Sequence, residues 1–157
     1  MKHLILFGIM WLCGLMTVVA QNVPQVIPAL QQWKPAKGKM VLPESGKVII
    51  SSDEEGALKQ SAEILVQDLK EMFGWNYRVV IGKQEKGAVF LTLSKPDKTL
   101  GDEGYRMDVR NGVTIEAPTA KGVFWGTRTL LQMIHNQPEG LMRGQATDFP
   151  LYPNRGF

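Results

Sequence analysis

The chain has 157 residues, of which 44% are hydrophobic and 21% are charged, and its net charge is +3. This length fits one ordinary domain, alone or behind an export signal, and excludes a (β/α)8 barrel, which needs roughly 250 residues. The single cysteine excludes a disulfide framework and a multi-cysteine zinc site, and the scattered charges include no lysine and arginine run typical of nucleic-acid binding.

The first segment of the chain has the pattern of a secretory signal peptide. Lys2 and His3 precede an apolar stretch, residues 4–20, that contains no acidic residue and ends in side chains of small or medium size. The alternative is a membrane anchor, but the stretch is short for a hydrocarbon core of about 30 Å and no positive flank follows it. We therefore predict cleavage after residue 20 and a secreted or periplasmic protein. Cys13 would leave with the signal.

Short apolar runs predict several strands in the mature chain. The segment 23–33 contains prolines, and we place it at a sheet edge because proline cannot donate a ladder hydrogen bond. β-branched or alternating patterns predict further short strands at residues 40–42, 47–51, 77–81 and 88–93.

A first helix is predicted over residues 54–73. Ser52 and Glu55 have the spacing of a capping box at its start, and Gly74 has the position of a C-terminal cap. Apolar residues recur at spacings of three and four, which predicts one buried stripe made of Leu58, Ala62, Leu65, Leu69 and Met72.

The clearest hairpin joins residues 105–109 to residues 113–117. Apolar and polar side chains alternate in both segments, so one face of the sheet is expected to be apolar and the other wet. Asn111 and Gly112 between them predict a two-residue type I′ turn.

A second helix is predicted from Thr119, as its cap, to about His135. Its buried stripe consists of Val123, Thr127, Leu130 and Ile134. Gly122 and Gly126 lie on one face, where each costs about 1 kcal/mol of helix propensity, and we expect them to allow close approach to the sheet. The remaining residues, 136–157, have the composition of a linker, with a short strand possible at 145–147.

The chain lacks the usual catalytic and metal-binding motifs. His135 is the only histidine after the signal, so a Ser-His-Asp triad or a multi-histidine metal site would depend on it. Asp102 and Glu103 form a carboxylate pair of the kind used in acid–base chemistry, but they lie in a glycine-flanked turn where polar residues are expected anyway. We predict no catalytic residue, no cofactor and no metal ion.

Three tryptophans keep a binding function open. The rings of Trp33, Trp75 and Trp125 could stack on the apolar faces of sugars, or could simply pack within the domain.

Three segments together resemble one known family. Residues 104–109 contain a Gly-Tyr strand, residues 113–117 a hairpin ending in alanine, and residues 121–132 a Gly-x-x-x-Gly helix with Thr-Leu-x-Gln. With the Pro-rich exit at residues 147–157, they are similar to the non-catalytic N-terminal domain of family 20 glycoside hydrolases, the β-N-acetylhexosaminidases. The resemblance covers nearly all of residues 23–157.

The resemblance implies a fold and a domain division. The implied fold is α+β: a mostly antiparallel sheet with two helices packed on one face, similar in shape to zinc peptidases but without zinc. The chain then divides into a signal peptide (1–20), the accessory domain (21–146), and an exit linker (147–157) that ends with the first residues of a catalytic barrel. Our strand and helix predictions from the residues alone agree with this architecture.

The resemblance also implies a function. Arg155 matches an arginine that hydrogen-bonds hydroxyls of the terminal N-acetylhexosamine, while the family's catalytic Asp-Glu pair would lie beyond Phe157, so Asp102 and Glu103 are not that pair. The chain would be an inactive accessory domain of an exported enzyme that cleaves terminal N-acetylhexosamine from glycans. Its partner would be the barrel of the same polypeptide, with no nucleic acid and, after cleavage, no membrane.

Two alternatives remain at this stage. The chain could be the accessory domain of another glycosidase, O-GlcNAcase-like or α-glucuronidase-like, or it could be a stand-alone glycan-binding module.

Overall fold

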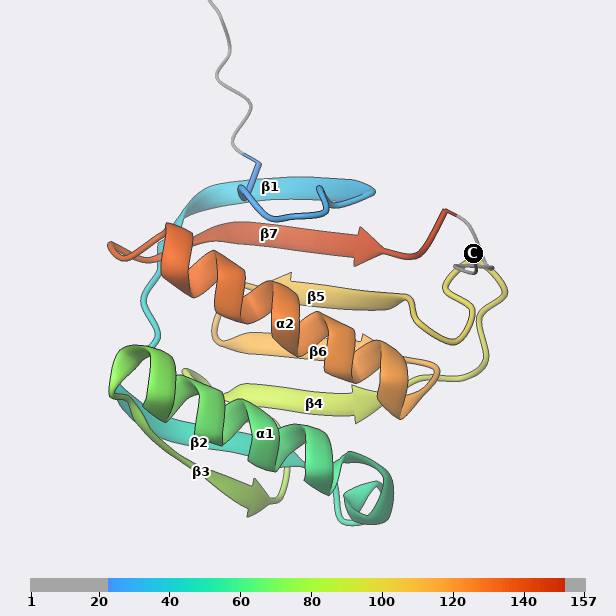
Figure 1. The fold of residues 1–157 in the computed structure, drawn as a ribbon, viewed down its shortest axis with the longest axis horizontal. Coiled ribbons are helices and arrows are strands. Elements are labelled where there is room, and N and C mark those ends of the chain that lie inside the picture. Colours follow the sequence, from blue (N-terminus) through green and yellow to red (C-terminus); the bar gives the residue numbers. More distant parts are fainter. Residues whose placement is uncertain (1–22, 152–157) are drawn as a thin grey trace, which may run out of the picture.

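A single mixed sheet organises the part of the chain that the computed structural model describes, residues 23–151. Two helices, α1 (Glu55–Phe73) and α2 (Ala120–Asn136), lie on one face of this sheet (Figure 1). The sheet order is β1-β7-β5-β6-β4-β2-β3. The strands are β1 (Gln32–Met40), β2 (Ser45–Ile50), β3 (Asn76–Ile81), β4 (Val89–Leu93), β5 (Tyr105–Val109), β6 (Val113–Ala117) and β7 (Leu141–Asp148). The predicted α+β class, with two helices on one face, is confirmed.

The sheet is divided into an antiparallel half and a parallel half. Antiparallel pairing joins β1 to β7, β7 to β5 and β5 to β6. Parallel pairing joins β6 to β4, β4 to β2 and β2 to β3. The β2–β3 pair is parallel because α1 carries the chain from the end of β2 back to the start of β3, and such helical crossovers join parallel strands. The predominance of antiparallel pairing that the resemblance implies therefore describes one half of the sheet.

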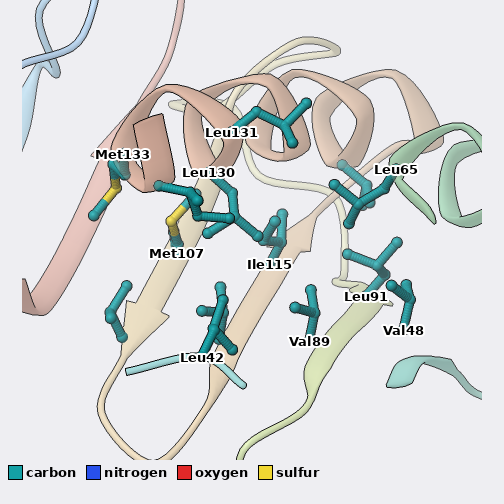
Figure 2. Close-up of a cluster of buried hydrophobic side chains, with 14 of the residues drawn as sticks. Leu42, Val48, Leu65, Val89, Leu91, Met107, Ile115, Leu130, Leu131 and Met133 are labelled. Carbon is teal, nitrogen blue, oxygen red and sulfur yellow. The ribbon is translucent and has the colours of Figure 1, made fainter. Parts of the chain in front are cut away.

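The hydrophobic core lies between the helices and the sheet. Figure 2 shows Leu130 of α2 beside Met107 and Ile115 of the sheet, and all three are fully buried. Both predicted helix stripes are buried except at Met72, whose side chain is 54% exposed. The prediction for Met72 was wrong because the next residue, Phe73, makes the core contact in the last turn of α1. No helix in residues 23–151 combines the length and apolar character that crossing a membrane requires.

The start of α1 differs from the capping box expected at Ser52 and Glu55. The N-cap residue is Glu54, and its side chain makes no capping hydrogen bond. The Glu54 carboxylate instead accepts hydrogen bonds from the backbone N–H of Leu93 (3.0 Å) and the hydroxyl of Thr92 (3.2 Å). These two hydrogen bonds fix the start of the helix to the end of β4. The residues that they join lie 38 and 39 positions apart in the chain. The C-terminal cap is confirmed, since Gly74 has φ of 72° and its N–H donates to the Lys70 carbonyl.

The β5–β6 hairpin is confirmed, but its turn is not type I′. Val109 pairs with Val113, so three residues connect the strands. A type I′ turn needs positive φ at both central residues, and no non-glycine residue in the described range has positive φ, which excludes it for Asn111. Gly112 serves another purpose, since a Cβ there would lie 2.6 Å from the Ala88 carbonyl oxygen. The turn therefore packs directly against the chain leading into β4.

The first and last predicted strands have different bounds in the structure. The N-terminal edge strand is present as β1, but it begins at Gln32 rather than within residues 23–31 and ends at Met40, so residues 40–42 form no separate strand. The strand predicted at 145–147 is the longer β7, which reaches Asp148. The signal sequence at residues 1–20 lies outside the described residues.

Helix α2 lies very close to the sheet, as its two glycines predicted. A Cβ at Gly122 would lie 2.4 Å from the Gly104 carbonyl oxygen, and one at Gly126 would lie 2.4 Å from the Ile115 Cγ2 atom. Real Cβ atoms do not approach other atoms so closely, so α2 could not occupy this position with alanine at either site. The predicted Thr119 cap is also present, with its hydroxyl accepting the Gly122 N–H at 3.1 Å.

This packing gives a stability prediction for Gly122→Ala. The substitution should lower the free energy of unfolding by about 1–3 kcal/mol, the usual cost of overpacking, because the contact is with backbone atoms that cannot rotate away. Urea unfolding followed by circular dichroism measures the change. Gly56→Ala in α1 is the matched control, since no atom outside its own helix backbone lies within 4 Å, and it should not destabilise the chain. Equal losses for the two variants would contradict the close-approach explanation.

Candidate functional site

A groove of about 410 Å³ lies where the chain enters and leaves the sheet. We call it the exit groove. Four parts of the chain form it: the N-terminal segment, the loop before β5, the outer side of α2, and the residues that follow β7. Its lining consists of Ile27, Pro28, Gln31, Glu103, Tyr105, Trp125, Arg128, Thr129, Gln132, Asp148, Phe149, Pro150 and Leu151. In Figure 1 the loop between β4 and β5 and the end of β7 lie at the same end of the sheet.

A chain of hydrogen bonds runs beneath this groove. The Tyr105 hydroxyl donates to Asp148 Oδ2 at 3.2 Å and lies 2.6 Å from the Thr129 hydroxyl, which then acts as the donor to Tyr105. The other carboxylate oxygen of Asp148 accepts the backbone N–H of Gln31 at 3.2 Å. Helix α2, strands β5 and β7 and the N-terminal segment are therefore fixed to one another at this point.

Helix α2 also holds the N-terminal segment through side-chain amides. Gln132 accepts the backbone N–H of Ile27 at 2.8 Å and donates to the Ile27 carbonyl at 3.1 Å. Asn136 donates to the Gln25 carbonyl at 2.7 Å. These bonds explain why residues 23–31 form no strand: their backbone groups bind the helix rather than the sheet.

The charged residues around the groove are paired within the domain. Arg128 forms an ion pair with Asp68 of α1, and its guanidinium lies 4.7 Å from the centre of the Phe124 ring. Glu103 pairs with Lys121 at 2.6 Å. Because these charges already have partners, the surface that the groove offers to another molecule is mainly apolar.

The carboxylate pair singled out in the sequence has a structural role. Glu103 binds Lys121, and the backbone carbonyl of Asp102 accepts the Thr119 hydroxyl at 2.5 Å. Both residues thus hold the loop before β5 against the start of α2. His135 is exposed near the end of α2, and nowhere in residues 23–151 do three or more His, Cys, Asp or Glu side chains gather as a metal site would require. Arg155 lies outside the described residues.

The three tryptophans do not form a common surface. Trp125, which is 39% exposed, lines the exit groove. Trp75 stacks on Tyr77 with 6.0 Å between ring centres and lines a separate groove beside His135. Trp33 lies on β1 against Gly144, where a Cβ would be 2.4 Å from its ring. A single sugar platform built from all three rings is therefore excluded.

Sequence patterns do not predict the exit groove, although its residues lie in the segments that carry the family resemblance. Tyr105, Thr129, Gln132 and Asp148 all belong to the segments that carried the family resemblance, and all four line the exit groove. No periodicity or spacing linked them, since Tyr105 bonds to Thr129 and Asp148 across 24 and 43 positions and Gln132 bonds to Ile27 across 105. Their common presence in those segments was the one available signal.

Comparisons with known proteins agree with the resemblance. The family model described as "Glycosyl hydrolase family 20, domain 2" matches residues 23–149. A lacto-N-biosidase of Bifidobacterium bifidum is 30% identical over 135 residues, which is 85% of this chain but 12% of that protein.

Solved structures give the same result. The family 20 β-N-acetylhexosaminidase of Streptomyces coelicolor is 28% identical with a TM-score of 0.67, covering 83% of this chain and 27% of that one. The N-acetyl-β-hexosaminidase of Streptomyces plicatus is 26% identical with a TM-score of 0.68, covering 84% of this chain and 27% of that one. The chain thus spans a small part of the length of each relative.

Two buried tyrosines predict a loss of stability in alkali. Burial raises the pKa of Tyr77 to about 12 and raises the pKa of Tyr105 above its usual value of 10.0. Unfolded tyrosines ionise near pH 10, whereas these two keep their protons in the folded chain, so their contribution is complete below pH 10 and is lost as pH rises through 12. Urea unfolding at pH 8, 10 and 11 should show this fall.

The variant Tyr105→Phe tests the contribution of this hydroxyl at neutral pH and at alkaline pH. At neutral pH the substitution should lower the free energy of unfolding by about 1–3 kcal/mol, because Asp148 and Thr129 lose a buried partner. Above pH 10 its stability should decline less steeply than that of the parent chain. If the free energy of unfolding of the variant fell above pH 10 as steeply as that of the parent chain, Tyr105 would ionise as an exposed tyrosine does.

Proposed function

Since the chain belongs to glycosyl hydrolase family 20, we propose that it is the non-catalytic accessory domain of an exported β-N-acetylhexosaminidase. The observation that carries the proposal is that the chain matches one domain of the family and is much shorter than its relatives. The model for domain 2 of the family matches residues 23–149, yet the chain spans only 27% of the Streptomyces coelicolor enzyme. The family match favours this interpretation over an O-GlcNAcase-like or α-glucuronidase-like enzyme.

The geometry of the exit groove supports a non-catalytic role. Hydrolysis of a glycosidic bond needs an acid and a second group that acts on the anomeric carbon. In the groove, Asp148 accepts a hydrogen bond from Tyr105 and Glu103 forms an ion pair with Lys121, and burial raises the pKa of the Tyr105 hydroxyl above its ordinary value. These groups support the backbone around the groove, so the chemistry is assigned to a barrel beyond Phe157.

The complete enzyme would remove terminal N-acetylhexosamine residues from glycans. The family resemblance implies a mechanism in which an Asp of the barrel orients the substrate acetamido group as the nucleophile and a Glu is the acid and base. Arg155 would contribute from this chain by hydrogen-bonding paired sugar hydroxyls with its planar fork of donors. Asp148, which the domain holds through Tyr105 and Gln31, lies seven positions before Arg155 and would fix the start of the segment that carries it.

The proposal includes the location and division of the chain. Residues 1–20 would direct export and be removed, which leaves a secreted or periplasmic enzyme. Residues 21–146 would form the accessory domain and 147–157 the linker into the barrel. The role of the domain would be to pack against the barrel and stabilise it.

The first test uses the gene itself. The DNA downstream of codon 157 should encode a barrel of roughly 250 residues with an adjacent Asp-Glu pair. The complete polypeptide should hydrolyse a chromogenic N-acetylglucosaminide, and residues 21–157 alone should not. Turnover by pure 21–157 that disappears on Asp102→Ala or Glu103→Ala would overturn the assignment.

Arg155→Ala in the complete polypeptide tests the substrate-binding role. Loss of two charge-assisted hydrogen bonds should reduce kcat/KM by about 100-fold, largely through KM if the bonds are equally strong in the ground and transition states. Steady-state kinetics on the same substrate measures the change. Arg78→Ala, at an exposed position on edge strand β3, is the matched control and should leave kcat/KM unchanged. Equal kinetics for the two variants would remove Arg155 from the site.

A further inference from the structure

A second groove, of about 310 Å³, lies at the opposite end of the sheet from the exit groove. Figure 1 shows the last turns of both helices and the connection from β1 to β2 together at this end. We call it the Trp75 groove. The lining residues that matter for its chemistry are Val41, Glu44, Trp75, His135, Gln137 and Pro138. Its volume lies at the lower end of the range for small-molecule sites.

An aromatic ring in the wall of the Trp75 groove is held in a fixed position. Trp75 is partly exposed, and its ring stacks on Tyr77 with 6.0 Å between ring centres. The Tyr77 hydroxyl donates to the Pro43 carbonyl at 2.8 Å. The backbone N–H of Asn76 donates to the Glu44 carbonyl at 2.7 Å. The ring and the segment that carries Glu44 are therefore joined, so the groove is formed before a ligand arrives, which lowers the cost of binding.

Two polar side chains of this groove have no partner within residues 23–151. The carboxylate of Glu44 and the imidazole of His135 are both exposed, and neither forms a hydrogen bond or an ion pair there. In the exit groove, by contrast, Asp148 and Glu103 are bound within the domain. A carboxylate offers acceptors and an imidazole carries at least one donor, so the Trp75 groove can bind a polar ligand.

A third polar group is buried at this groove without a partner. The Oε1 atom of Gln137 accepts the backbone N–H of Met142 at 2.6 Å, which fixes the orientation of the amide. The Nε2 atom is left buried and makes no hydrogen bond with any residue that the structure describes. Buried donors are normally paired, so a ligand that brings an acceptor to this side of the groove would satisfy Gln137.

These features match an N-acetylated sugar. The apolar face of a pyranose ring can pack on the Trp75 ring, while its polar edge needs hydrogen-bond partners. Glu44 can accept from the acetamido N–H, and His135 or Gln137 can donate to the acetamido carbonyl. The acetamido methyl group can lie on Val41, which is 70% exposed. A purely apolar side chain of a protein partner would leave these polar groups unpaired.

We propose that the Trp75 groove is a non-catalytic binding site for an N-acetylhexosamine unit of a glycan. The choice of N-acetylhexosamine over other acetylated sugars rests on the proposed function. The groove lies away from the exit, so it binds the glycan without taking part in cleavage. A glycan with several such units gains a second contact with the enzyme, which raises the avidity of the complex.

An NMR titration of the chain without its signal, residues 21–157, locates the binding. This chain contains Trp33, Trp75 and Trp125, so three indole N–H signals are expected, and Trp75→Phe assigns one of them. Triacetylchitotriose should shift the Trp75 signal with a dissociation constant of about 1 mM and leave the Trp125 signal in place. Cellotriose, whose units lack the acetamido group, should bind at least about tenfold more weakly.

Glu44→Ala tests the polar edge of the site, and its exposed position makes a folding defect unnecessary to consider. It should weaken binding of triacetylchitotriose about tenfold, as expected for the loss of a hydrogen bond to a charged group. Glu63→Ala, at an exposed position of α1 outside the groove, is the matched control and should bind as the parent chain does.

Four results would overturn the proposal. They are no shift of the Trp75 signal at about 10 mM triacetylchitotriose, a shift of the Trp125 signal in its place, equal affinity for cellotriose, and equal affinity of the Glu44→Ala and Glu63→Ala variants.

Hydrolysis by the complete polypeptide separates failure of this site from failure of the proposed function. If the polypeptide cleaves a chromogenic N-acetylglucosaminide while the Trp75 signal does not respond to sugar, the proposed function stands and the glycan site is wrong. If the Trp75 signal responds as expected but the polypeptide has no such activity, the glycan site stands and the enzymatic assignment is wrong.

Discussion

The close contact between α2 and the sheet is the constraint on which the other features depend. Because Gly122 and Gly126 have no side chains, the helix backbone reaches the Gly104 carbonyl and the Ile115 side chain directly. At that depth Thr129 comes within hydrogen-bonding distance of Tyr105, whose hydroxyl in turn binds Asp148 at the end of β7. A helix held farther from the sheet would lose this sequence of contacts, and the exit groove would lose its floor.

The two halves of the sheet have different tasks. The parallel half, covered by α1, contributes the deeply buried residues Val48 and Leu91 and contains none of the groove lining. The antiparallel half, covered by α2, holds both the N-terminal segment and the start of the exit. The ion pair between Asp68 and Arg128 connects the two helices, so the layers that cover the two halves of the sheet are coupled to each other.

Local patterns in the sequence predicted local structure and little else. Both helices, the β5–β6 hairpin and the close approach at Gly122 followed from periodicity or from short motifs, which act over a few residues. Three other features join distant parts of the chain. The Glu54 carboxylate accepts a hydrogen bond from Leu93 of β4, β2 lies between β3 and β4, and Gln132 bonds to Ile27. No local pattern encodes such pairings, so the groove became visible only when the fold brought its four segments together.

The hydrogen bond from Gln31 to Asp148 brings the two ends of the domain to one point on its surface. Gln32 also pairs with Thr147 across β1 and β7, so the chain enters and departs on neighbouring strands. A unit built this way can be gained or lost during gene rearrangement without separating the sequences on either side of it. Because its two ends meet at one place, the domain could be inserted into or removed from a longer polypeptide as a unit.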